Sequence, residues 1–213
     1  MLAIMYDKNH PNKLVMKQVE KQTPKSEEVL VKVYAVSVNA ADYRSMKMGI
    51  IPKRKIFGAD IAGRVEAVGS SVRSLKVGDD VFGDISGCGF GGFAEYVAVP
   101  EQVLVRKPES VTYEVAAALP MAAVTALQAL RNKGKIKKDD KVLICGAGGG
   151  VGSFAVQLAK CFGAEVTVVC SEKNAILMKE ILDRAYPFEK AVEAMKYMSN
   201  GHAKGKVIIR VAN

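Results

Sequence analysis

The sequence predicts an α/β protein with an all-β portion, in which a β-barrel is joined to part of a parallel sheet. Residues 139–171 read as a strand, a glycine-rich turn, a helix and a second strand, which is the order of a parallel βαβ unit. Residues 1–110 instead contain short strands separated by glycine-bearing turns, which is typical of a small β-barrel.

The βαβ unit can be placed residue by residue. Its first strand is expected at 141–145, a short apolar run of the kind buried in parallel sheets. About eleven residues at helical spacing then end at Gly163, a suitable helix C-cap. A second strand is expected at 165–170.

The glycine-rich turn has the spacing of a dinucleotide-binding fingerprint. Ala147, Gly149 and Gly152 form A-x-G-x-x-G, which provides a tight turn, close approach to a pyrophosphate and close packing of helix on strand. Free amides at the start of the helix favour phosphate. A glycine cluster alone is most often a plain turn, so the flanking strands and helix carry the prediction. The expected cofactor-binding residues here are Ala147, Gly148, Gly149, Gly150, Val151 and Gly152.

The end of the second strand bears on which dinucleotide is bound. Ser171 and Lys173 suit the 2′-phosphate of NADP(H), as a hydroxyl donor and a counter-charge. Glu172 could instead accept a hydrogen bond from the free 2′-hydroxyl of NAD. In a third interpretation all three residues form a solvated loop tip. The sequence favours NADP(H).

Composition limits the partners. The chain has 213 residues and a net charge of +9, with small basic clusters at 53–55 and 133–141. The charge is dispersed and aromatic residues make up only 7% of the chain, so no nucleic-acid partner is expected. The clusters are interpreted as solvated loops that also help to attract an anionic cofactor.

The sequence also bears on where the protein is located and on whether it binds a metal. No apolar run reaches membrane-spanning length and the first residues lack a secretory pattern, so no membrane partner is expected. The four cysteines are scattered, without a C-x-x-C pair, which indicates neither a zinc knuckle nor a disulfide framework. A reducing cytoplasm is the expected location.

The all-β portion has a strand at 28–36, where apolar residues alternate as in a half-buried strand. Further strands are expected near 61–68, 80–82 and 94–99, with one short helix at 40–48.

A helix at 120–130 should link the two parts. The C-terminus predicts a loop containing Tyr186 and Pro187, an amphipathic helix at about 188–198 and a last strand at 206–211.

Several segments, in order and spacing, resemble the medium-chain dehydrogenases/reductases. Within that superfamily they are most similar to the zinc-independent quinone oxidoreductase branch related to zeta-crystallin, whose members are also called NAD(P)-dependent alcohol dehydrogenases. The segments include VSVNAADYRSMKMG, IFGADIAGRVEAVGSSVRSLKVGDDVFG, GGFAEYVAVP, AAALPMAAVTALQAL and GAGGGVG. The resemblance implies a GroES-like β-barrel domain packed on a Rossmann domain. By this resemblance, residues 1–122 and 184–213 form the GroES-like domain and residues 123–183 a partial Rossmann domain.

The Rossmann part looks truncated inside the chain. After Asn174 the family continues through four more strand-helix units, whereas residues from 182 onward resemble the family's extreme C-terminus. Four units at roughly 25 to 30 residues each mean that about 100 residues are absent. A helix beginning at 175–180 would have to accommodate the junction.

The resemblance also implies an activity, namely NADPH-dependent, zinc-independent hydride transfer to a quinone or an activated alkene or carbonyl. Val38 to Ala40 and Gly58 to Asp60 stand where zinc-dependent relatives have their ligands, so no metal site is expected. Asn39 and Tyr43 would position the nicotinamide and the substrate, and Thr125 would lie near the nicotinamide.

Purely structural roles are the alternatives for two of these residues. Asn39 could cap the helix that follows it, and the Thr125 hydroxyl could form a hydrogen bond with its own helix backbone.

Loss of the far wall of the Rossmann domain leaves a second functional hypothesis open. The chain could be a catalytically inactive remnant that serves as a cofactor-binding or protein-interaction module. Two parallel strands alone leave apolar faces and open edges, so a homodimer through this remnant is one expectation.

Overall fold

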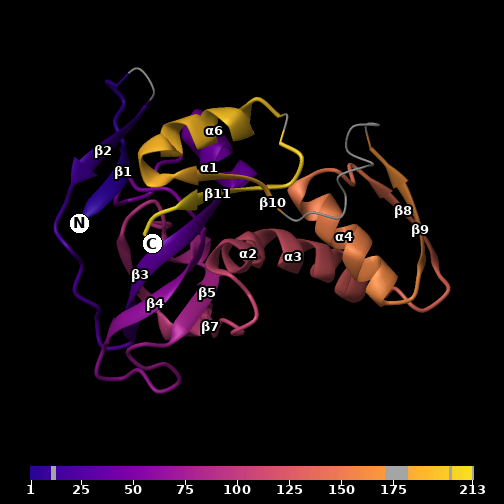
Figure 1. The fold of residues 1–213 in the computed structure, drawn as a ribbon, viewed down its shortest axis with the longest axis horizontal. Helices are drawn as coiled ribbons and strands as arrows, with labels where there is room; N and C mark the ends of the chain where they lie inside the picture. The colour runs from indigo at the N-terminus through magenta and orange to yellow at the C-terminus, as the bar shows by residue number, and fades with distance from the viewer. Residues whose placement is uncertain (11–12, 171–181, 202, 213) are drawn as a thin grey trace.

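A computed structural model describes residues 1–10, 13–170, 182–201 and 203–212 of the chain. Figure 1 shows a β-rich part that contains both ends of the chain, and a smaller part made of α4, β8 and β9, with α3 leading from one to the other. No helix within those described ranges is long and apolar enough to cross a bilayer.

One curved sheet forms the β-rich part. Its strands are β3 (Glu28–Val38), β4 (Asp60–Val68), β5 (Asp80–Asp84), β6 (Tyr96–Pro100), β7 (Val105–Arg106), β10 (Leu182–Pro187) and β11 (Lys206–Arg210). The strand order is β10-β11-β3-β4-β5-β7, and β6 pairs with the first half of β3 while β11 pairs with its second half. The long strand β3 therefore holds three partners together, which bends the sheet around one core.

A separate hairpin closes this core. It consists of β1 (Leu2–Tyr6) and β2 (Leu14–Gln18), and bridges from Ala3 to Ala94 and from Met5 to Ile56 attach it to the rest. Alternate residues of β3, among them Val29, Val31 and Val33, are fully buried. The apolar alternation of the sequence thus sets which face of β3 points inward.

Short helices cover the β-rich part. They are η1 (Ser86–Cys88), η2 (Glu101–Val103), η4 (Phe188–Lys190), α1 (Ala40–Lys47), α2 (Tyr113–Ala118) and α6 (Ala191–Ser199). Helix α6 lies against α1 and β11 (Figure 1). Its apolar residues Ala191, Ala194 and Met195 are part of the core. The three alanines of α2 pack on Ala35, Ala62 and Ile208, where small side chains allow close approach.

The βαβ unit comprises β8 (Lys141–Cys145), α4 (Gly150–Cys161) and β9 (Glu165–Val169), with β8 and β9 parallel. One face of these strands packs on α4 through Ile144, Val156 and Ala159. On the other face Leu143 is 62% exposed and Val169 53% exposed. Among the described residues, β8 has a strand partner on one edge only.

The connection between the two parts is α3 (Pro120–Leu127), followed by a π-helical turn, η3 (Gln128–Lys133). Phe154 of α4 packs on Ala122 and Ala126 of α3. The βαβ unit is therefore held against the linking helix by an aromatic ring seated on small residues.

The fold class predicted from the sequence is confirmed, and the differences have local causes. The predicted helix at 120–130 ends its regular part at Leu127, because the chain there changes to the wider π-helical turn. The residues before Pro187, expected as a loop, form β10, because parallel pairing with β11 satisfies their backbone. The helix expected from residue 175 lies outside the described residues.

Candidate cofactor-binding site

The glycine-rich turn is fixed to both strands of the βαβ unit. Gly146 and Ala147 donate their backbone N–H groups to the carbonyl of Val169, at 2.9 and 3.3 Å. Gly149 donates to the carbonyl of Gly146 at 3.0 Å, which closes the turn, and Gly146 has a φ of 73° that favours glycine. The chain therefore enters α4 at the carboxyl end of the two parallel strands.

Gly152, in the first turn of α4, is required by space. A Cβ there would overlap the carbonyl oxygen of Gly146 and lie 2.8 Å from the Cα of Ala147. Gly149 has no neighbour closer than 3.4 Å to such an atom, so its backbone stays open to an approaching group. The first amides of the twelve-residue helix α4 face this opening, and an anion is stabilised there. The pyrophosphate of a dinucleotide fits this cradle.

A buried polar cluster of the barrel lies beside the turn. The ammonium of Lys206 is 2.5 Å from Oδ1 of Asn39 and 3.6 Å from Oδ2 of Asp60. Asn39 Nδ2 donates to Asp60 Oδ2 at 3.0 Å, so the three side chains form a closed triangle. All three are at most 5% exposed. The stem of Lys206 lies against Gly150, with its Cδ 3.1 Å from the place of a Cβ there.

Two carboxylates anchor the cluster to the backbone. Asp42 accepts hydrogen bonds from the N–H of Asn39 at 2.7 Å and of Gly58 at 2.9 Å, which fixes the start of α1. Asp60 accepts from the N–H of Met121 at 3.1 Å, in the first turn of α3. The cluster therefore connects β4, α1, α3 and β11.

Burial dominates the electrostatics of this cluster. It raises the pKa of Asp42 from 3.8 to about 7, against the two backbone hydrogen bonds. It also raises the pKa of Asp60 to about 6, although Lys206 and Asn39 oppose the shift. Burial lowers the pKa of Lys206, which Asp60 partly offsets. Two carboxyls and one ammonium therefore share a site that favours neutral forms.

Asn39, the first predicted catalytic residue, lies in this cluster. It also stands at the N-cap position of α1, but its side chain is directed to Asp60 and Lys206. Tyr43 lies elsewhere: its ring packs among side chains of α1 and α6, beside a cavity of about 60 Å³ that Met46 and Val192 also line. The cavity that Tyr43 lines does not include Asn39.

Thr125 faces a different cavity. Its hydroxyl donates to the carbonyl of Met121 at 2.6 Å, the helix-internal bond that the sequence left as an alternative. The cavity, of about 430 Å³, lies between α3 and β5 and is also lined by Asp84 and Gln128. Ala147 to Gly149 lie in the turn described above and Gly150 to Gly152 in the first turn of α4. Ser171 and Lys173 lie outside the described residues.

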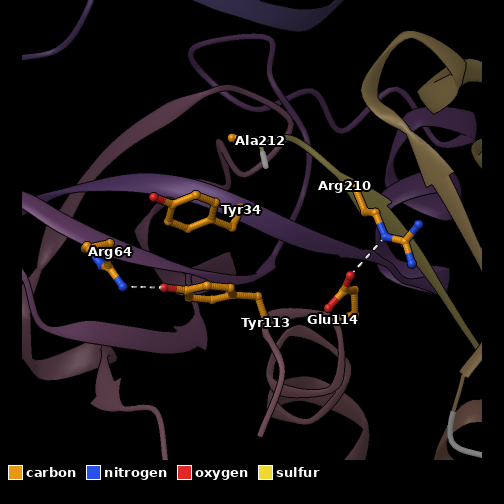
Figure 2. A pocket seen from close by; sticks show the side chains of 6 residues that line it. All are labelled: Tyr34, Arg64, Tyr113, Glu114, Arg210 and Ala212. Carbon is orange, nitrogen blue, oxygen red and sulfur yellow. Dashed lines mark hydrogen bonds and ion pairs between the residues drawn. The ribbon is translucent and has the colours of Figure 1, made fainter. Parts of the chain in front are cut away.

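A further cavity, of about 470 Å³, opens on the barrel (Figure 2). It is lined by Tyr34, Arg64, Tyr113, Glu114, Arg210 and Ala212. The rings of Tyr34 and Tyr113 stack on one another at 4.6 Å, and Arg210 is paired with Glu114 at 2.9 Å. No residue of β8 or α4 lines it, so it is separate from the candidate dinucleotide cradle.

Sequence reasoning missed Lys206, and it noted Asp60 only within the segment 58–60, where zinc-dependent relatives have a ligand. A lysine at the start of an apolar strand was the available signal, because the three residues that follow it, 207–209, are all buried. Its partner Asn39 is 167 positions away, and no local pattern reports such a contact.

A GroES-like β-barrel set against the glycine turn of a βαβ unit is the architecture of the medium-chain dehydrogenases/reductases. Residues 25–109 match the family model of the alcohol dehydrogenase GroES-like domain, and residues 175–209 match a zinc-binding dehydrogenase model. The chain belongs to the medium-chain dehydrogenase/reductase superfamily, in its quinone oxidoreductase branch.

Curated relatives support this branch. The chain is 42% identical over 185 residues to a chloroplast envelope quinone oxidoreductase homolog of Arabidopsis thaliana, covering 80% of this chain and 56% of the relative. It is 37% identical over 204 residues to a chloroplastic quinone-oxidoreductase homolog of Spinacia oleracea, covering 88% of this chain and 62% of the relative. The chain thus spans little more than half the length of these relatives.

Solved structures share the fold. The quinone oxidoreductase of Coxiella burnetii matches with a TM-score of 0.89 at 23% identity, over 100% of this chain and 99% of that one. An alcohol dehydrogenase superfamily protein of Novosphingobium aromaticivorans matches with a TM-score of 0.75 at 32% identity, over 85% of this chain and 56% of that one.

Proposed function

We propose that this chain is an NADPH-dependent, zinc-independent oxidoreductase that transfers a hydride to a quinone or to an activated alkene or carbonyl. The observation that carries the proposal is Lys206, which contacts Asn39 in the barrel while its stem lies on Gly150 of the glycine turn. The predicted substrate side and the predicted cofactor side therefore meet at one residue. Quinone oxidoreductase homologs among the relatives support the substrate class.

The chain's own residues would hold the cofactor at its phosphate end. The open backbone at Gly149 and the first amides of α4 would bind the pyrophosphate. The stem of Lys206 lies against this turn, while its ammonium is held by Asn39 and Asp60. Ser171 and Lys173 would bind the 2′-phosphate, as their residue types suggest. When bound, the nicotinamide supplies the hydride.

Asn39 is suited to positioning rather than to proton transfer. Its amide oxygen accepts from Lys206 and its amide nitrogen donates to Asp60, so two opposite charges fix the orientation of the amide. A side chain held in this way costs little further ordering when a substrate or nicotinamide binds. Thr125, on α3, would lie near the nicotinamide. Tyr43 would contribute only by packing, which holds α1 and therefore Asn39 in place.

We infer the remaining organisation from the same features. Residues 1–122 with 184–213 are taken as the GroES-like domain, and residues 123–183 as the partial Rossmann domain. The exposed face around Leu143 suits a homodimer. The described cysteines are all free, which fits a reducing compartment such as the cytoplasm.

The second candidate function is a catalytically inactive module that binds the cofactor or another protein. It is favoured by the sheet of the βαβ unit, in which the described strands β8 and β9 pair only with each other. In this case the glycine turn would bind dinucleotide, but no wall would enclose the nicotinamide.

Turnover separates the two candidates. Purified chain is mixed with NADPH and a benzoquinone or an enone, and NADPH oxidation is followed with Gly152→Ala as the matched control. Oxidation that depends on both substrate and Gly152 supports the enzyme. Dinucleotide binding without substrate-dependent oxidation supports the inactive module.

A further inference from the structure

An apolar tip projects from the barrel after α1. Met48 and Ile50 are 69% and 56% exposed, and the turn between them is made by Gly49, whose φ of 73° favours glycine. Single exposed apolar residues are normal on a protein surface, and exposed apolar groups mark contact sites where they are clustered. Here the two are separated by one residue only. The two residues form what we call the apolar tip.

Basic residues surround the apolar tip. The exposed cations before and after it are Arg44, Lys47, Lys53, Arg54 and Lys55. Residues 43–59 contain no aspartate or glutamate. Within the described part of the chain, none of the ion pairs of 4.0 Å or less involves these five cations. Their charge is therefore directed to solvent rather than neutralised within the chain.

A groove beside the tip adds two more cations. It has a volume of about 420 Å³, and its lining includes Ile51 together with Lys8, Lys17 and Lys55. Its carboxylate is Asp7, which lies 3.2 Å from Lys17. Three ammonium groups around one carboxylate leave the groove positively charged. An anionic group of the size of a phosphate ester can be accommodated there.

We propose that this surface docks on an anionic lipid bilayer. Met48 and Ile50 enter the interfacial region, the surrounding cations contact the charged headgroups, and the groove of Lys8, Lys17 and Lys55 holds one lipid phosphate. Apolar side chains ringed by lysine and arginine are the arrangement by which proteins lie on a membrane without crossing it. This proposal differs from the sequence expectation of no membrane partner, and the vesicle experiment below decides between them.

The features distinguish a bilayer from the other anionic partners. Nucleic acid would call for aromatic rings that stack on bases, whereas the tip itself is aliphatic. An acidic protein would require no exposed methionine and isoleucine at the centre of the cations. The bilayer uses both the charge and the apolar tip.

The test is sedimentation of the full chain with phosphatidylcholine vesicles, with and without phosphatidylglycerol. We expect binding only when phosphatidylglycerol is present, and weaker binding as salt is raised. The triple variant Lys47→Gln, Lys53→Gln, Lys55→Gln should partition on the order of 100-fold more weakly, from about fivefold per cation.

A matched control removes the same charge elsewhere. Lys133→Gln, Lys135→Gln, Lys137→Gln also loses three of the nine net positive charges, from exposed positions near η3. This control should bind within about twofold of the parent chain. Equal losses in the two triple variants would show a general charge effect and overturn the proposal.

A second variant tests insertion at constant charge. Met48→Ser with Ile50→Ser should weaken vesicle binding by about tenfold or more, since the apolar area that enters the interface is lost. Unchanged binding of this variant would overturn the proposal, as would equal binding to vesicles without phosphatidylglycerol. Retention of a DNA duplex by the tip cations, with no vesicle binding, would assign the surface to nucleic acid instead.

Discussion

The ammonium of Lys206, on the last strand, lies 2.5 Å from the amide oxygen of Asn39, which precedes it by 167 positions. This contact joins the C-terminal segment to the start of α1 inside the barrel. Because the stem of Lys206 also lies on Gly150, the same residue reaches the turn that would hold the cofactor. The C-terminal strand therefore completes the candidate site as well as the sheet.

Lys206→Met should destabilise the chain by about 3–5 kcal/mol at neutral pH, because it leaves the carboxylate of Asp60 buried without its cation. The double variant Asp60→Asn, Lys206→Met should recover most of this loss, since no unpaired charge remains. Urea unfolding of the two variants and the parent measures both effects. Equal destabilisation by the single and double variants would mean that the ion pair is not what Lys206 contributes.

The free energy of unfolding should fall as pH rises from about 4 to about 7. Asp42 and Asp60 have pKa values of about 7 and about 6 in the folded chain, above the usual 3.8, so the folded state binds more protons than the unfolded state in this window. Each group contributes a slope of at most about 1.4 kcal/mol per pH unit. Urea unfolding between pH 5 and pH 7 measures it.

Asp42→Asn is the control for this pH dependence. It removes the carboxyl with the higher pKa while an amide oxygen can still accept a backbone hydrogen bond. The decline between pH 6 and pH 7 should be reduced in this variant. The lowered pKa of Lys206 contributes to the pH dependence with the opposite sign, so the test is the difference in slope between Asp42→Asn and the parent chain. A stability that rises across the window in the parent chain would contradict the burial argument.

Gly152→Ala should weaken dinucleotide binding, with an affinity lower by about tenfold or more. A Cβ at this position would overlap Gly146 and lie 2.8 Å from the Cα of Ala147, so the turn must move away from the helix. Gly87→Ala is the matched control, because no atom lies within 4 Å of a Cβ there. Binding by both variants is measured by calorimetry. Unchanged binding by the first would mean that the turn is not the phosphate site.

Self-association should depend on the exposed face of the βαβ unit. Leu143→Ser with Val169→Ser removes apolar area at positions that are 62% and 53% exposed, next to the open edge of β8. Sedimentation velocity should show a concentration-dependent dimer for the parent and a monomer for this variant. Val77→Ser with Val105→Ser removes similar exposed area elsewhere and should still dimerise. A monomeric parent chain at all concentrations would contradict the expectation.

The sequence predicted the parts of the fold that depend on local pattern. The glycine turn, the strand at 141–145 and the buried alternation of β3 follow from spacing alone. Strand β10 escaped prediction, because its residues show little apolar alternation and it exists through pairing with β11. The short strand β7 also escaped prediction, because its two residues form a strand only through pairing with β5.

The sequence predicted the barrel part and the glycine-turn part of the candidate site, but not the contact that joins them. Asn39 and the turn at 147–152 were identified, whereas Lys206 was not, because the contact that joins them spans most of the chain. Tyr43 was placed with Asn39 from their shared motif, yet four residues along the chain its ring faces α6. Helical spacing alone would place positions 39 and 43 on one face. Asn39, however, is the N-cap and has extended backbone (φ −110°, ψ 159°), so its side chain does not follow the helical spacing.

Calorimetric titration of the purified chain with NADPH, with NADH as comparator, tests the central claim most directly. The account predicts micromolar binding of NADPH, several-fold tighter than that of NADH, and loss of this binding in Gly152→Ala. Absence of binding by a demonstrably folded sample would contradict it, and the βαβ unit would then be structural only.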